Sequence, residues 1–97
     1  MDIKELENEF VGSAEVRGFK FKQLWANGYA YLYEVRMPAL SDPYYEVFER
    51  RVNRVYGCVV YPKAKAFGRW AWHRFSLEEA RLKYDDITKR LKRKRMA

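Results

Sequence analysis

An amphipathic segment near the end of the chain, residues 76–91, constrains the fold most strongly. Ser76 and Glu79 have the spacing of a capping box, which satisfies the free backbone amides at the start of a helix. Apolar residues then recur at steps of three and four, so they share one helix face. These residues are Leu77, Ala80, Tyr84, Ile87 and Leu91. The pattern predicts a C-terminal helix with one buried face, on which Phe75 packs against Ala80 as a hydrophobic staple.

Residues 16–36 predict a β-hairpin, with Asn27-Gly28 as the turn signal. A two-residue turn would mix charged and aromatic side chains on both faces, whereas a three-residue loop over 26–28 separates them. Gly28 takes the left-handed backbone conformation that this loop requires. In the chosen register one face pairs Trp25 with Tyr29, Gln23 with Tyr31, Phe21 with Tyr33 and Phe19 with Val35.

The two faces of this hairpin have different expected partners. We expect the aromatic face, with Phe21 and Tyr33 on it, to lie under the C-terminal helix. The other face carries Leu24, Ala30 and Leu32 among its charged residues. We expect that face to stay partly exposed, which makes a homodimer or a partner protein possible there.

The middle of the chain is less decisive. For residues 44–54, an N-cap at Asp42 and Pro43 in the first helical position favour a helix. Apolar β-formers and a neighbouring hairpin that needs a third strand favour a strand, and we choose the strand. Short strands are also predicted over 58–61 and 69–75, with a loop between them. At the other end, residues 2–10 predict a short N-terminal helix, with Asp2 as its N-cap and Gly12 after its end.

These elements add up to an α+β fold. We expect a three- to four-stranded antiparallel β-meander packed against one C-terminal α-helix, with a possible short N-terminal helix. The length of 97 residues suits one domain, and 48% apolar residues can supply its core. We assign residues 1–88 to this domain and residues 89–97 to a basic helix end or tail.

Several classes of protein are disfavoured by composition. One cysteine, Cys58, and one histidine, His73, allow neither an internal disulfide nor a zinc site, so we expect no metal and no cofactor. The charged first residues argue against a secretory signal, and no apolar run approaches the roughly 18 residues of a spanning helix. We therefore expect a cytoplasmic protein without a membrane-spanning segment.

The net charge of +7 is concentrated at the C-terminal end. Residues 89–95 contain six cations and no acid: Lys89, Arg90, Lys92, Arg93, Lys94 and Arg95. Such a run suits phosphate, because each neutralised phosphate releases counterions and adds affinity that does not depend on sequence. It also fits a solvated terminus, an acidic protein surface or anionic lipid.

Aromatic rings between cations are a second candidate for binding. Single-strand binders hold bases by stacking on exposed rings near basic side chains. The candidate platform rings are those left outside the core once one face is covered, which are Tyr44 or Tyr45 and one of Trp70 and Trp72. The cations near them, which we add to the candidate nucleic-acid set, are Arg50, Arg51, Arg54, Arg69 and Arg74. Most rings in a domain of this size are needed for its core, which is the competing interpretation.

No constellation for catalysis is evident in the sequence. His73 has no serine, cysteine or carboxylate at a recognisable spacing, and a nucleophile needs a base within hydrogen-bond reach. A lone histidine on an aromatic strand is more often structural. Cys58, between Gly57 and Val59, is interpreted as a small buried hydrophobe. We therefore expect no enzymatic activity and no small-molecule substrate.

Part of the chain resembles two known families. Trp72, Phe75-Ser76 and Glu78-Glu79-Ala80 resemble the last strand and helix of plant-type AP2 DNA-binding domains. Together with the Tyr44–Phe48 segment, the same region is similar to WGR domains, which are nucleic-acid-associated modules of sheet and helix. The Trp-Gly-Arg signature is absent, so no functional residue is carried over. The resemblance favours a strand at 44–52.

Two functions follow from these observations. The first is a small non-enzymatic module that contacts nucleic acid through residues 89–95, helped by Arg50, Arg51 and Arg54. The second is a protein-interaction or inhibitor module that uses the open sheet face, for example as a homodimer.

Overall fold

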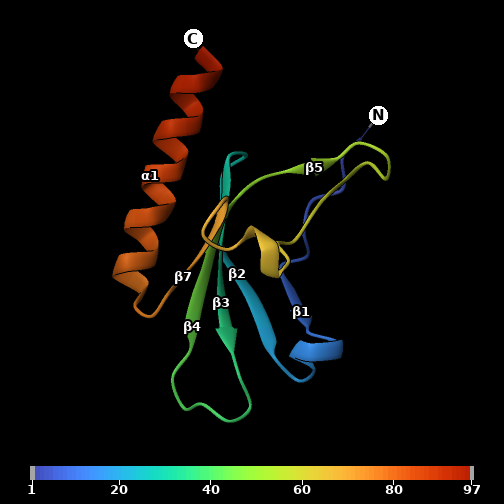
Figure 1. Ribbon diagram of the computed structural model, residues 1–97, viewed down its shortest axis with the longest axis vertical. Coiled ribbons are helices and arrows are strands. Elements are labelled where there is room, and N and C mark those ends of the chain that lie inside the picture. The colour runs from blue at the N-terminus through green and yellow to red at the C-terminus, as the bar shows by residue number, and fades with distance from the viewer. Residues whose placement is uncertain (1, 97) are drawn as a thin grey trace.

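In the computed structural model, which describes residues 2–96, an antiparallel sheet has the strand order β1-β2-β3-β4-β7. Its strands are β1 (Glu9–Val11), β2 (Lys20–Ala26), β3 (Ala30–Arg36), β4 (Tyr44–Glu49) and β7 (Ala71–Arg74). One helix, α1 (Leu77–Met96), packs on a face of this sheet and runs beyond the upper end of the strands (Figure 1). The α+β class is confirmed, and the sheet has five strands because β1, which was not predicted, adds an edge strand beside β2.

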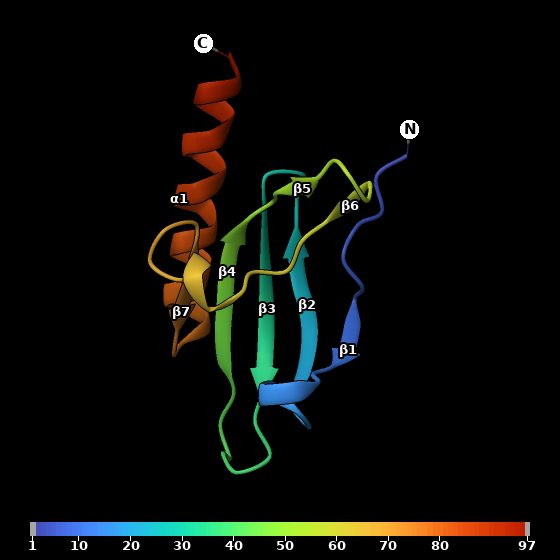
Figure 2. The same ribbon diagram turned by 45° about the vertical axis from the view of Figure 1, so that its right-hand side comes forward.

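A second, two-stranded sheet pairs β5 (Val52–Asn53) with β6 (Cys58–Val59). Figure 2 shows β4, β3, β2 and β1 side by side, with β5 and β6 at their upper end. Two 3-10 helices complete the described elements, η1 (Ala14–Val16) and η2 (Ala64–Ala66). The predicted strands in the middle of the chain are confirmed, although each is shorter than expected.

The predicted N-terminal helix over residues 2–10 is wrong. The backbone of Lys4 instead joins β6: the Lys4 amide donates to Gly57 at 2.9 Å, and the Val59 amide donates to Lys4 at 2.8 Å. Ile3 and Leu6 pack into the core from this extended segment. A helix this short has a costly nucleus, and the extended form gains both pairing and burial.

The buried face of α1 matches the predicted stripe from Ala80 onward. Ala80 and Ile87 are fully buried, and the amide of Glu79 donates to Ser76 Oγ at 3.1 Å, so Ser76 is confirmed as the cap of α1. Phe75 is 81% exposed, and the hydrophobic staple is therefore wrong. No helix among residues 2–96 has the length and apolar character needed to cross a membrane.

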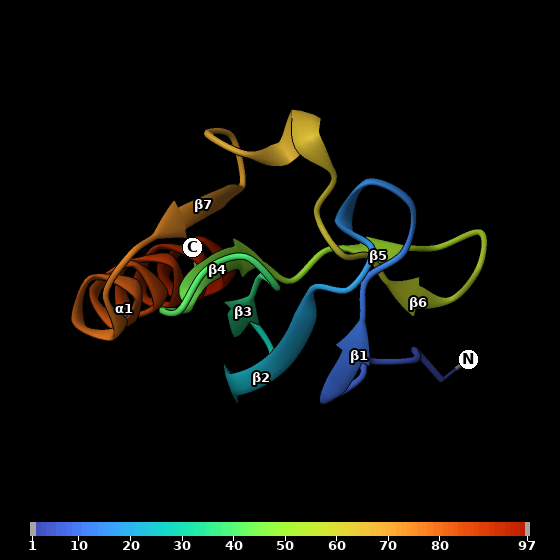
Figure 3. The same cartoon turned by 90° about the horizontal axis from the view of Figure 1, so that it is seen from below.

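The two sheet faces are the reverse of those predicted. Ala30 and Leu32, expected on the open face, are fully buried beneath α1. The aromatic face, with Phe21 and Tyr33, is covered by the N-terminal segment, β6 and the segment around η2. Figure 3 shows α1 nearly end-on at the β7–β4 side, while β5 and β6 lie toward β1. Leu24, Ala30 and Leu32, the apolar residues of the predicted open face, therefore lie under α1, whereas Lys20 and Lys22 of β2 stay exposed.

The predicted hairpin register is also wrong. Phe21 pairs with Val35 and Gln23 with Tyr33, and the register then shifts by one residue so that Trp25 pairs with Leu32. This β-bulge brings Leu24 and Trp25 both to the α1 side, whereas a regular strand would alternate them. Gly28 has a φ of +85°, as predicted for the turn.

Candidate nucleic-acid interface

The candidate site lies where three sheet strands end beside the last turns of α1. Tyr29 directly precedes β3 and Arg50 directly follows β4, and the Arg50 amide donates to the Tyr29 carbonyl at 2.7 Å. The side-chain oxygen of Asn27 accepts the amides of Tyr29 and Ala30, which fixes the turn. Asn27 Nδ2 also donates to Thr88 Oγ1 at 2.8 Å. The turn is therefore attached to α1 just before the basic run begins.

This attachment forms a shallow basic hollow, which we call the Tyr29 hollow. Its volume is about 310 Å³. Its lining residues are Gly28, Tyr29, Arg50, Leu91, Lys94 and Arg95. The Arg95 guanidinium lies 5.4 Å from the centroid of the Tyr29 ring, within the range of a cation–π contact. A half-buried aromatic ring is thus surrounded by three cations from two separate segments, the end of β4 and the last turn of α1.

Buried Glu49 connects α1 to the end of the sheet. It is 7% exposed, and it accepts hydrogen bonds from Arg51 at 3.0 Å and from Arg90 at 2.8 Å. The Arg51 guanidinium also lies 5.0 Å from the centroid of the Trp70 ring. Arg90, Glu49, Arg51 and Trp70 therefore form a continuous row across the end of the sheet. The sequence gives no signal for Glu49, because its role depends on where α1 passes.

Arg50 is anchored from the opposite side. Its guanidinium donates to the carboxylate of Glu5, which also accepts a hydrogen bond from Tyr31. The hydrogen bond from Arg50 lowers the pKa of Glu5, so this carboxylate stays ionised. Arg50 is consequently held in place at the rim of the Tyr29 hollow.

A second hollow, of about 600 Å³, lies beside Trp70, and we call it the Trp70 hollow. Its lining residues are Val60, Tyr61, Lys63, Ala64, Lys65, Ala66, Arg69 and Trp70. The three cations, Lys63, Lys65 and Arg69, are exposed, whereas Trp70 and Tyr61 are half-buried. The hollow therefore combines an apolar floor with a basic rim.

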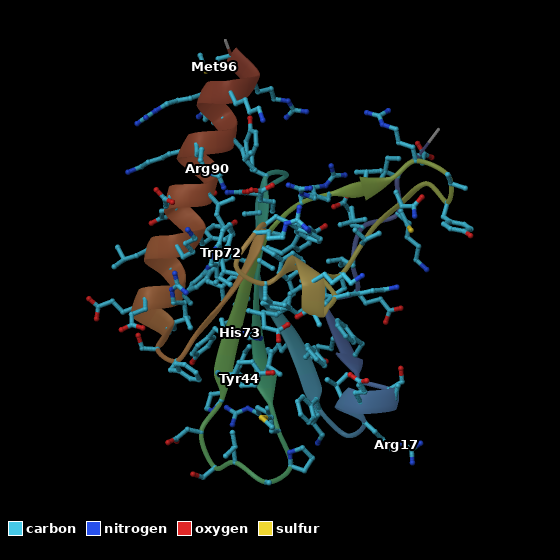
Figure 4. All side chains as sticks on the ribbon, in the orientation of Figure 1. Arg17, Tyr44, Trp72, His73, Arg90 and Met96 are labelled. Carbon is cyan, nitrogen blue, oxygen red and sulfur yellow. The ribbon has the colours of Figure 1, made fainter. Side chains whose placement is uncertain are left out.

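The predicted site residues are only partly brought together. Arg50, Arg51, Arg90, Lys94 and Arg95 gather at this end of the sheet, and Lys89, Lys92 and Arg93 are exposed on the same turns of α1. Figure 4 places Arg90 and Met96 at this end.

Two predicted cations lie elsewhere. Arg54 is in the β5–β6 turn, on the side away from α1 (Figure 1). Arg74 ends β7 opposite Tyr45 and donates to the His73 carbonyl at 2.7 Å.

The four predicted platform rings do not share a surface. Tyr44 and Trp70 pack with the aromatic core, whereas Tyr45 and Trp72 pack under α1. Lys83 of α1 covers Trp72, with its Nζ 3.9 Å from the ring centroid. Of the four, Trp70 alone lines a hollow at the basic end. Tyr29 was not predicted as a platform residue, because its exposure depends on the turn geometry.

A cluster around Glu46 is the main feature that sequence reasoning missed. Glu46 is 6% exposed and accepts from Tyr61 at 2.7 Å and from Tyr44 at 3.3 Å. His73 Nε2 lies 3.3 Å from the same carboxylate, because β4 and β7 pair Glu46 with His73. Figure 4 shows Tyr44 and His73 side by side, well below Arg90. The His73 ring stacks on Phe67 at 4.1 Å, so it forms part of the covering of Glu46.

These carboxylate–tyrosine contacts predict a loss of stability in alkali. Burial and the neighbouring Glu46 raise the pKa of Tyr44 to about 12, and burial raises the pKa of Tyr61 further. A group whose pKa is higher in the folded state stabilises below its unfolded pKa, here 10.0. Stability should therefore decrease as the pH rises from 10 through 12. Urea unfolding across this interval checks it, and Tyr44→Phe should flatten the dependence.

Comparison of the chain with protein-family models, curated proteins and solved structures finds no significant match. Among residues 2–96, no group of three or more His, Cys, Asp or Glu side chains is placed to hold a metal ion.

Proposed function

We propose that this protein is a non-enzymatic module that binds nucleic acid through the last two turns of α1. The observation that carries the proposal is the gathering of Lys94 and Arg95 of α1 with Arg50 and Tyr29 in one hollow. These side chains come from three distant segments, so their proximity is a property of the fold. A cationic surface of this kind attracts the phosphate backbone.

The charge balance supports this choice. Glu49 engages Arg51 and Arg90, and Glu5 engages Arg50, but the exposed cations beyond them form no ion pair with another described residue. These cations are Lys89, Lys92, Arg93, Lys94 and Arg95. The two carboxylates hold Arg50, Arg51 and Arg90 in place, and the end of α1 keeps its positive charge. The protein-interaction alternative relied on an open face with Leu24, Ala30 and Leu32, and these three residues pack against α1.

The test is a triple substitution, Lys92→Gln, Arg93→Gln and Lys94→Gln, in the full chain. It spares Arg90 and Leu91, which attach α1 to the sheet. Binding of an oligothymidine and of a mixed-sequence DNA duplex should be measured between about 50 and 200 mM salt. The slope of log affinity against log salt should fall by roughly 2–3, since each lost phosphate contact removes about 0.7–0.9.

A matched control removes the same charge elsewhere. Arg17, Lys20 and Lys22 are also one arginine and two lysines, all exposed, and Arg17 lies far from Arg90 in Figure 4. Changing these three to Gln should leave the salt slope nearly unchanged. Equal losses in the two triple variants would contradict the proposal, and so would a parent protein whose binding to both probes is absent at low salt.

A further inference from the structure

The Tyr29 and Trp70 hollows lie at the same end of the sheet, on either side of β4. Ala30, which follows Tyr29, pairs with Glu49, and the Glu49 amide donates to the Trp70 carbonyl at 3.0 Å. The strand order β3-β4-β7 therefore separates Tyr29 from Trp70 by two interstrand spacings. At about 4.8 Å per spacing, their backbones are roughly 10 Å apart.

Both hollows have the same composition, an aromatic ring with cations around it. Tyr29 has Arg50, Lys94 and Arg95, and Trp70 has Lys63, Lys65 and Arg69. Arg51 lies between them, because it contacts the Trp70 ring and, through Glu49, the Arg90 side chain. Cations thus continue along the whole path from one ring to the other.

We infer that this path binds a single strand of nucleic acid, with one base against Tyr29 and another against Trp70. The inference rests on the proposed function and specifies its substrate class. A strand with the roughly 3.4 Å spacing of stacked nucleotides covers 10 Å in about three nucleotides. Rings between cations hold the flat faces of unpaired bases, whereas a duplex keeps those faces inside its own stack. A duplex therefore leaves both rings without a partner.

The first test compares probes and Tyr29 variants. An oligothymidine of about 12 nucleotides should bind more tightly than a duplex of equal length. Tyr29→Ala should weaken oligothymidine binding by roughly 5- to 150-fold, the range for one stacked base, while Tyr29→Phe retains the ring and most of the affinity. Tyr56→Ala, which removes a 79% exposed tyrosine from the β5–β6 turn, is the control and should have little effect.

The second test uses tryptophan fluorescence to detect binding at the Trp70 hollow. Stacking of a base should quench tryptophan fluorescence when oligothymidine is added, and Trp70→Phe should remove most of that quenching. Trp72→Phe should retain it, because Trp72 packs under α1 with Lys83 over its ring. Should Trp70→Phe fold poorly, Lys63→Gln with Lys65→Gln and Arg69→Gln removes only exposed charge, and this variant should lower single-strand affinity more than duplex affinity.

The outcomes separate the two proposals. Equal binding of duplex and single strand, with no loss in Tyr29→Ala and quenching that survives Trp70→Phe, would overturn the single-strand path and leave nucleic-acid binding intact. Absence of salt-dependent binding to either probe would overturn both proposals.

Discussion

Phe48→Ala should lower the free energy of unfolding by about 3–5 kcal/mol, the usual cost of removing a buried aromatic ring. Phe48 is fully buried at the centre of the aromatic face. Its ring centroid lies 5.5 Å from that of Tyr31, 5.9 Å from Tyr33 and 4.9 Å from Tyr61. The substitution leaves a cavity, because the strands and the segment that covers them can move only partly into the empty space. Urea unfolding of the two proteins measures the difference.

Phe75→Ala is the matched control, since it removes the same atoms from a side chain that is 81% exposed. Its expected effect is within about 0.5 kcal/mol of zero. Similar costs for the two substitutions would show that the aromatic face does not hold the fold together as described.

Removing the partners of Glu46 should have an effect of similar size. In the double variant Tyr61→Phe and His73→Phe, Tyr44 is the one described partner left to the buried carboxylate, and its hydroxyl lies 3.3 Å away. An ionised group left buried without its partners costs about 3–5 kcal/mol. Chemical denaturation near neutral pH should show this loss, while each single substitution should cost less.

A third substitution, Glu46→Gln, tests this explanation, because it should change stability in opposite directions in the parent protein and in the double variant. Glu46→Gln should destabilise the parent protein, because the carboxylate there accepts from Tyr61 at 2.7 Å. In the double variant the same change should restore stability, because a neutral amide is cheaper to bury than an unpaired charge. A further loss in that background would show that packing, and not the buried charge, causes the effect.

The sequence predicted the elements whose signals are local. The cap at Ser76 and the stripe from Ala80 to Leu91 specify α1 without reference to any other segment. The N-terminal helix failed because Lys4 finds a backbone partner in β6, more than fifty residues away in the chain. A short local pattern carries no information about such a partner.

The register and the faces failed for a related reason. Reasoning from alternation assumes a regular strand, but the bulge between Gln23 and Trp25 reverses the alternation within β2. The assumption put Trp25 with the rings of the aromatic face, although it packs under α1. The position of a bulge depends on the side chains that both faces of the sheet must bury. The sequence pattern of one strand does not show these requirements.

Sequence reasoning predicted most of the charged residues of the candidate site, but it did not predict how the fold arranges them. The cations of residues 89–95 are visible in the sequence as a run, but Glu49 and Tyr29 acquire their roles from the positions of strand ends. The pairing of Glu46 with His73 likewise follows from the β4–β7 register, which could not be read from either strand alone.

The hydrogen bond between Asn27 and Thr88 joins positions 61 residues apart, and it attaches the turn before Tyr29 to α1. The walls of the Tyr29 hollow belong to three segments, and the part from α1 joins the other two only when α1 is seated on the sheet. Ligand binding and helix seating are therefore thermodynamically linked. A bound ligand holds α1 in place, and the measured affinity is scaled by the fraction of molecules in which α1 is seated. Substitutions deep beneath the helix can then alter affinity without contacting the ligand.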